Sequence, residues 1–181
     1  MADNTTVCWY PMYCAYASEM KVKAELDGLG IEAYIPMKYA LVEHGIERRR
    51  ELVPAIHNLI FVHESRERIT ELKMYNSVCT HLQYMMSTTL DGARRFLIIP
   101  DASMKNFMLV TSQYSDQIVY LRYDDYLNKP GSHVRIIDGI FAGVEGVIKR
   151  IKKDRVVVVL LKGVAAVAIT EITFDHLQYL D

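Results

Sequence analysis

The stretch Ile56-His-Asn-Leu-Ile-Phe-Val-His63 decides how the first part of the chain is interpreted. In a β-strand, successive side chains point to opposite faces of the sheet. This alternation places Ile60 and Val62 on one face, and Leu59 and Phe61 on the other. Both faces are therefore apolar. The residues alone leave two interpretations open: a sheet covered on both sides, or an exposed apolar patch that docks a partner.

The residues around this strand predict an α+β domain. Residues 7–15 predict another strand, which Pro11 would place at an edge of the sheet or make irregular. Ser18 stands at the N-cap position of a helix that carries Val22 and Leu26 on one face. Residues 31–42 and 47–53 predict strands around the turn at residues 44–45, and residues 65–74 and the segment after Pro100 predict helices. With a closing strand at residues 118–123, we expect an antiparallel sheet flanked by helices over residues 1–125.

The last part of the chain has a different character. From residue 129 onward, short apolar runs at residues 133–137, 146–151, 156–161 and 164–169 alternate with glycine-containing turns. Closely spaced short strands are typical of a small barrel. We therefore expect a second domain over residues 126–181, a small all-β barrel of the SH3-like kind.

Composition limits the function classes. Of 181 residues, 51% are hydrophobic, and 21 Lys and Arg face 22 Asp and Glu, for a net charge of −1. A protein that coats nucleic acid usually carries a basic excess, which this chain lacks. The three cysteines form no C-x-x-C pair, so we expect neither a disulfide framework nor a zinc site. With no secretory signal and no apolar run long enough for a membrane helix, we expect a cytoplasmic protein without a membrane partner.

Charged residues offer few candidates for chemistry. The six histidines show no metal-ligand spacing, and no catalytic or nucleotide-binding motif is present, so we expect no enzyme, metal or cofactor. Two basic clusters are candidate nucleic-acid contacts, although a solvated hairpin tip is the favoured interpretation of each. Their members are Arg48, Arg49 and Arg50 in the first cluster, and Lys149, Arg150, Lys152 and Lys153 in the second.

Four segments in this order resemble the NusG family of transcription elongation factors over nearly the whole chain. The first is Trp9-Tyr-Pro-Met-Tyr-Cys14, followed by a helix with Glu19 and Val22. The second is Gly30-Ile-Glu-Ala-Tyr-Ile-Pro36, and the third leads from Val53-Pro54 into the strand at residues 58–62. The fourth, with Gly139, Phe141, Gly143 and Gly146, is similar to a KOW motif, whose glycines would allow the bends and close approaches of a small barrel.

The resemblance implies a function. It implies a monomeric factor whose N-terminal domain binds the clamp helices of RNA polymerase, suppresses pausing or termination, and contacts DNA in the elongation complex. The docking positions carried over from the family are Trp9, Tyr13, Leu59 and Phe61. The KOW barrel would recruit a ribosomal protein or a termination factor.

Departures from the family pattern favour a specialised member. Housekeeping members usually carry Pro-Gly-Tyr where this chain has His57-Asn-Leu59, and Asn58 with the opening at residues 9–14 is similar to RfaH-like paralogues. No counterpart of their polar loop is evident. The first hypothesis is therefore an antitermination factor bound to polymerase. The alternative is a free-standing nucleic-acid-binding module that acts through its basic residues.

Overall fold

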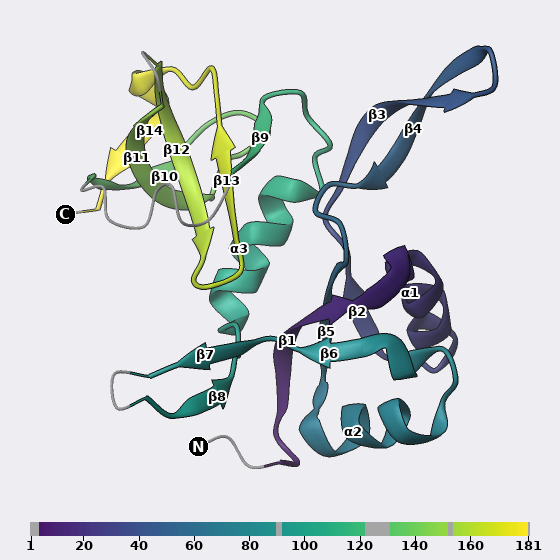
Figure 1. Ribbon diagram of the computed structural model, residues 1–181. Coiled ribbons are helices and arrows are strands. Elements are labelled where there is room, and N and C mark those ends of the chain that lie inside the picture. Colours follow the sequence, from purple (N-terminus) through teal and green to yellow (C-terminus); the bar gives the residue numbers. More distant parts are fainter. Residues whose placement is uncertain (1–3, 90–91, 122–130, 152–153, 181) are drawn as a thin grey trace. The chain divides into compact units, whose positions relative to one another are not determined.

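A computed structural model describes residues 4–89, 92–121, 131–151 and 154–180 (Figure 1). The chain divides into two compact units. The first unit combines Met1–Pro36 with Pro54–Asp101, and the second combines Met37–Val53 with Ala102–Asp181. The domain boundary predicted at residues 125 and 126 lies outside the described residues and stays a prediction.

The first unit contains a four-stranded antiparallel sheet in the order β2-β5-β1-β6. The strands are β1 (Val7–Cys14), β2 (Glu32–Tyr34), β5 (Leu59–Ser65) and β6 (Leu82–Tyr84). The register of β1 against β5 pairs Pro11 with Phe61. Of the two alternatives predicted from Pro11, an edge strand is wrong, because β1 lies between β5 and β6. The proline is tolerated there because the ladder with β6 begins only at Met12, one residue after Pro11.

Two helices pack against this sheet (Figure 1). They are α1 (Glu19–Gly28) and α2 (Arg66–Tyr75), and both were predicted. The Ser65 hydroxyl accepts a hydrogen bond from the Arg68 N–H, so it caps α2. The Tyr84 hydroxyl donates to the Arg66 carbonyl, and the Tyr84 ring meets Tyr10 edge to face. The face of β1 that carries Tyr10 and Met12 is therefore the α2 side of the sheet, and the face that carries Trp9 is the opposite one.

Short elements complete the first unit. They are two 3-10 turns, η1 (Ala15–Ala17) and η2 (Cys79–His81), and the paired strands β7 (Met86–Thr88) and β8 (Arg94–Phe96). Beyond β6, the Ile99 N–H donates to the Trp9 carbonyl.

The second unit holds a hairpin, a helix and a larger sheet (Figure 1). The hairpin is formed by β3 (Met37–His44) and β4 (Glu47–Pro54), and the helix is α3 (Asp101–Thr111), which buries Met104 and Phe107. The six-stranded antiparallel sheet has the order β14-β10-β11-β12-β13-β9. Its strands are β9 (Ile118–Leu121), β10 (His133–Ile136), β11 (Glu145–Ile151), β12 (Asp154–Leu161), β13 (Ala165–Ile169) and β14 (Leu177–Tyr179).

Two strands of this sheet differ from expectation. The strand predicted to close the first unit instead pairs through β9 with β13, because its alternating apolar side chains complete the larger sheet. Strand β14 pairs with β10 and was not predicted, since three residues without turn signals give too short a pattern. A mixed α and β chain with antiparallel sheets and a β-rich C-terminal part is confirmed. In the described part of the chain, no helix has the length and hydropathy needed to cross a bilayer.

Candidate functional site

Side chains of the neighbouring strands β1 and β5 lie beside one another in pairs, on the face of the first sheet opposite α2. Direct partners in the register are Trp9 with His63, Pro11 with Phe61, and Tyr13 with Leu59. We call these six residues the β1–β5 row. All four predicted docking residues, Trp9, Tyr13, Leu59 and Phe61, lie in it, although β1 and β5 are almost fifty residues apart in the chain.

Burial divides the β1–β5 row. Tyr13 is 45% exposed, whereas Leu59 is 5% exposed and Phe61 is fully buried. Trp9 is 4% exposed. Of the two interpretations left open by the sequence, the exposed patch is therefore wrong for Leu59 and Phe61 in this structure. Alternation predicts the face on which a side chain lies, but not whether other parts of the protein cover that face.

Trp9 is held in a stack that sequence reasoning missed. Its ring lies parallel to the His63 ring, with 4.6 Å between the centroids. His63 Nδ1 lies 2.8 Å from Glu32 Oε2, so the three residues form a line across β1, β5 and β2. The signal was present in the alternation that places His63 on the Phe61 face. The pairing of β1 with β5 was needed to identify its neighbour.

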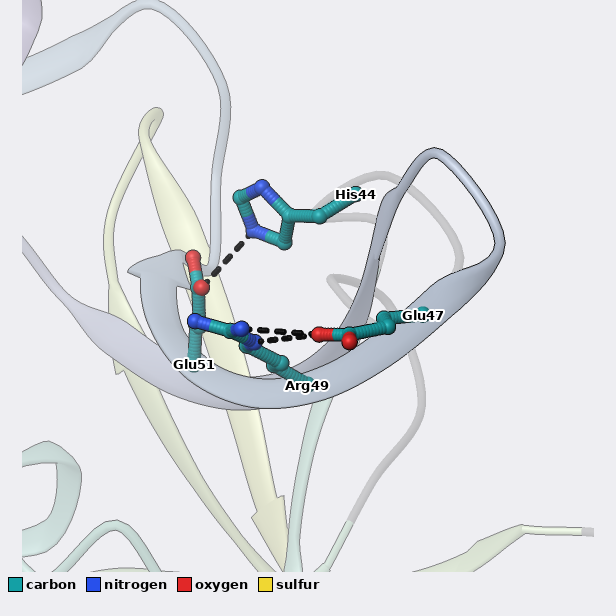
Figure 2. A network of polar contacts seen from close by, with 4 residues as sticks. All are labelled: His44, Glu47, Arg49 and Glu51. Atoms are coloured by element: carbon teal, nitrogen blue, oxygen red, sulfur yellow. Dashed lines mark hydrogen bonds and ion pairs between the residues drawn. The ribbon is translucent and has the colours of Figure 1, made fainter.

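The three predicted arginines of β4 are exposed, and each contacts a carboxylate. Arg48 pairs with Glu43 at 2.9 Å, Arg49 with Glu47 at 2.7 Å, and Arg50 with Asp116 at 3.3 Å. Figure 2 shows Arg49 and Glu47 beside the His44–Glu51 pair, which is separated by 2.8 Å. The positive charge of this cluster is therefore neutralised locally, which lowers its value as a phosphate-binding surface.

The second basic cluster is split between a buried and an exposed residue. Lys149 is 5% exposed, and its Cα partner in the sheet is Val156. Little of this side chain is therefore accessible to a phosphate backbone, and nucleic-acid contact by Lys149 stays a prediction. Arg150 is exposed, opposite Arg155. Lys152 and Lys153 lie outside the described residues.

The glycines of the KOW-like segment have the expected conformations. Gly139 and Gly143 have φ values of 81° and 89°, a region in which side chains with a Cβ are strained. A Cβ at Gly146 would lie 2.6 Å from Val157 Cγ1. Phe141 is 5% exposed. These residues therefore have a structural role in the turns and core of the larger sheet.

In the described part of the first unit, burial shifts the pKa of several titratable side chains. Burial raises the pKa of the Cys14 and Cys79 thiols, which disfavours the nucleophilic thiolate. Burial also raises the pKa of Tyr10 and Tyr84 and lowers that of Lys73, whose ammonium lies 4.7 Å from the centre of the Tyr84 ring. Within the described ranges, no three His, Cys, Asp or Glu side chains gather as a metal site.

Comparison with protein families matches two regions of the chain. A family model described as transcription termination factor nusG matches residues 7–108, and a model of the KOW motif matches residues 130–161. No curated protein sequence matched the chain. The first match covers β1 to most of α3, including the whole β1–β5 row, and the second covers β10 to β12. Because the first match spans more than half of the chain, the protein belongs to the NusG family of transcription termination and elongation factors.

Proposed function

We propose that this protein binds bacterial RNA polymerase in the cytoplasm through the β1–β5 row and suppresses pausing or termination. Factors of the NusG family interact with RNA polymerase and are transcription factors rather than enzymes. The observation that carries the proposal is the row itself: three aromatic rings and a leucine lie on one face of the matched region. Large aromatic side chains are the residues that most often dominate the free energy of protein–protein binding.

Accessibility makes Tyr13 the first contact in this proposal. Its side chain is 45% exposed, while Leu59 beside it is buried. Contact of polymerase with Leu59 and Phe61 therefore requires the side chains that cover them to move. A bound polymerase would then stabilise a conformation of this protein in which the row is open. The bound protein would in turn hold the polymerase clamp closed, which disfavours the paused state.

The C-terminal sheet is the proposed recruitment module. We propose that its six strands form an SH3-like barrel that binds a ribosomal protein or a termination factor. The KOW match and the turns at Gly139 and Gly143 support this. Asn58 has a φ of 61°, a conformation that glycine and asparagine tolerate best, which supports an RfaH-like paralogue with asparagine at a glycine position.

The alternative of a free-standing nucleic-acid-binding module has less support. Arg48, Arg49 and Arg50 all have carboxylate partners, and Lys149 is buried. DNA contact through exposed residues such as Arg150 remains part of the proposed elongation complex. A strong salt dependence of DNA affinity without polymerase would instead favour the alternative.

Binding to purified core polymerase tests the proposal. We expect the full chain to bind core polymerase and to shorten pauses in a purified transcription assay. Tyr13→Ala should weaken binding, whereas Tyr75→Ala, which changes an 83% exposed tyrosine at the end of α2, should not. A full chain that is folded but neither binds polymerase nor changes pausing would contradict the proposed function.

A further inference from the structure

Three residues with positive φ values meet at one end of the first sheet. Tyr16 and Ala17 in η1 have φ values of 61° and 48°, and Asn58, just before β5, has a φ of 61°. Residues with a Cβ rarely adopt this left-handed region, at a cost of roughly 1–2 kcal/mol each. Two consecutive residues in this conformation require other contacts to hold them.

Asn58 connects the strained segments. Its N–H donates to Glu19 Oε1 at 3.3 Å, and its Oδ1 accepts a hydrogen bond from the Ala17 N–H at 3.0 Å. Its carbonyl accepts from the Cys14 N–H at 2.8 Å. One residue therefore fixes the end of β1, the turn η1 and the start of α1 relative to β5. We call the Glu19–Asn58–Ala17 contacts the turn lock.

Glu19 has an unusual position for a carboxylate. Glu19 is only 2% exposed. Its second carboxylate oxygen, Oε2, is buried and has no hydrogen-bond partner in the described part of the chain. Burying a polar atom without a partner reduces stability. An arrangement that combines this cost with two strained residues, Tyr16 and Ala17, is expected where function needs the geometry.

The turn lock lies beside the accessible end of the β1–β5 row. Asn58 directly precedes Leu59, and Leu59 pairs with Tyr13, which is one residue before Cys14. The same strained turn presents Tyr16, which is 87% exposed and whose ring lies edge to face with His81 at 5.6 Å. The geometry points to Glu19 and Asn58 as positioning residues that set the Tyr13–Leu59 end of the row for polymerase. This inference rests on the proposed function.

Amide hydrogen exchange and polymerase binding, measured on the full chain, test the inference together. Glu19→Ala removes the acceptor for the Asn58 N–H, so exchange of that amide should become at least about tenfold faster. Affinity for core polymerase should fall about tenfold, which corresponds to about 1.4 kcal/mol. Glu19→Gln keeps an oxygen acceptor and should restore both values to within about threefold of the parent.

Matched controls separate positioning from general loss of stability. Glu25 lies on the same helix and accepts a hydrogen bond from Asn76 Nδ2 at 2.7 Å, away from Asn58, so Glu25→Ala should change neither value. If Glu19→Ala does not fold, Asn58→Gly and Asn58→Ala replace it. Glycine keeps the N–H and tolerates the positive φ, so Asn58→Gly should bind polymerase more tightly than Asn58→Ala.

The outcomes that overturn the inference differ from those that overturn the proposed function. Unchanged polymerase affinity in a folded Glu19→Ala variant would contradict it, as would equal affinity of Asn58→Gly and Asn58→Ala. So would unchanged exchange of the Asn58 amide. A parent chain that does not bind polymerase would contradict the proposed function, while the exchange rate would still report on the turn lock.

Discussion

The β1–β5 row and the β3–β4 hairpin are candidate contact surfaces of opposite character. The row is apolar and mostly buried, with Tyr13 as its accessible end. The hairpin is charged and exposed, but its arginines pair with carboxylates at 2.7 to 3.3 Å. Binding through the row would gain free energy by removing aromatic surface from water, whereas binding through the hairpin would first have to break ion pairs. Exposure alone therefore does not make a binding surface.

The largest effect is expected on fold stability, from a substitution on the face of β5 opposite the β1–β5 row. Val62 is fully buried on the side that carries Tyr10, so Val62→Glu should destabilise the fold by about 3 kcal/mol or more. Thermal unfolding followed by circular dichroism measures this. Because Phe61 is also fully buried, Phe61→Glu should destabilise the fold too. A folded Phe61→Glu protein with the stability of the parent would mean that this face opens readily.

The second effect concerns the accessible end of the row. Tyr13→Glu should leave the melting temperature nearly unchanged, because the side chain is 45% exposed. Affinity for core polymerase should fall by about ten- to a hundredfold, since a charge would enter a desolvated interface. Biolayer interferometry with immobilised polymerase measures the change. Equal affinity of Tyr13→Glu and the parent would remove Tyr13 from the contact surface.

The third effect compares a buried and an exposed cation on β11. Lys149 is 5% exposed, so Lys149→Ala should lower the free energy of unfolding by about 1–2 kcal/mol. Arg150→Ala, at the exposed neighbour, should change it by less than about 0.5 kcal/mol. Urea denaturation measures both. The reverse order would indicate that Lys149 is accessible and would support it as a candidate nucleic-acid contact.

The smallest effect is expected on the hairpin. Arg48 and Glu43 are both more than two-thirds exposed, so Arg48→Ala should change stability by less than about 0.5 kcal/mol. Polymerase affinity should also stay within about twofold, because the positive charge is already neutralised. A loss as large as that of Tyr13→Glu in the same binding assay would move the contact surface to the hairpin and reverse the comparison.

Local sequence patterns predicted the helices and strands more completely than they predicted which strands pair with one another. Spacing of Val22 and Leu26 predicted α1, and alternation around Phe61 predicted both the strand β5 and the face of each side chain. Pairing was harder to predict, because it depends on contacts far apart in sequence. The partner of the strand at Ile118–Leu121 is an example, since the same alternation would suit either sheet.

The candidate site shows the same division between local and non-local information. Alternation placed Leu59 and Phe61 together, and the family resemblance added Trp9 and Tyr13. Burial of Phe61 and Lys149 could not be predicted, because it depends on what packs above each residue. The turn lock could not be predicted either. In the sequence, Glu19 is an ordinary residue of a first helical turn, and its contact with Asn58 depends on the fold.

Site-specific photo-crosslinking tests the central claim, polymerase binding through the β1–β5 row, most directly. A photoreactive phenylalanine derivative at position 13 replaces a half-exposed tyrosine of the row, and the same group at position 75 replaces an 83% exposed tyrosine on α2. In a mixture with core polymerase, we expect the protein labelled at position 13 to crosslink to a polymerase subunit and the protein labelled at position 75 not to do so. Crosslinking from position 75 with none from position 13 would contradict the central claim.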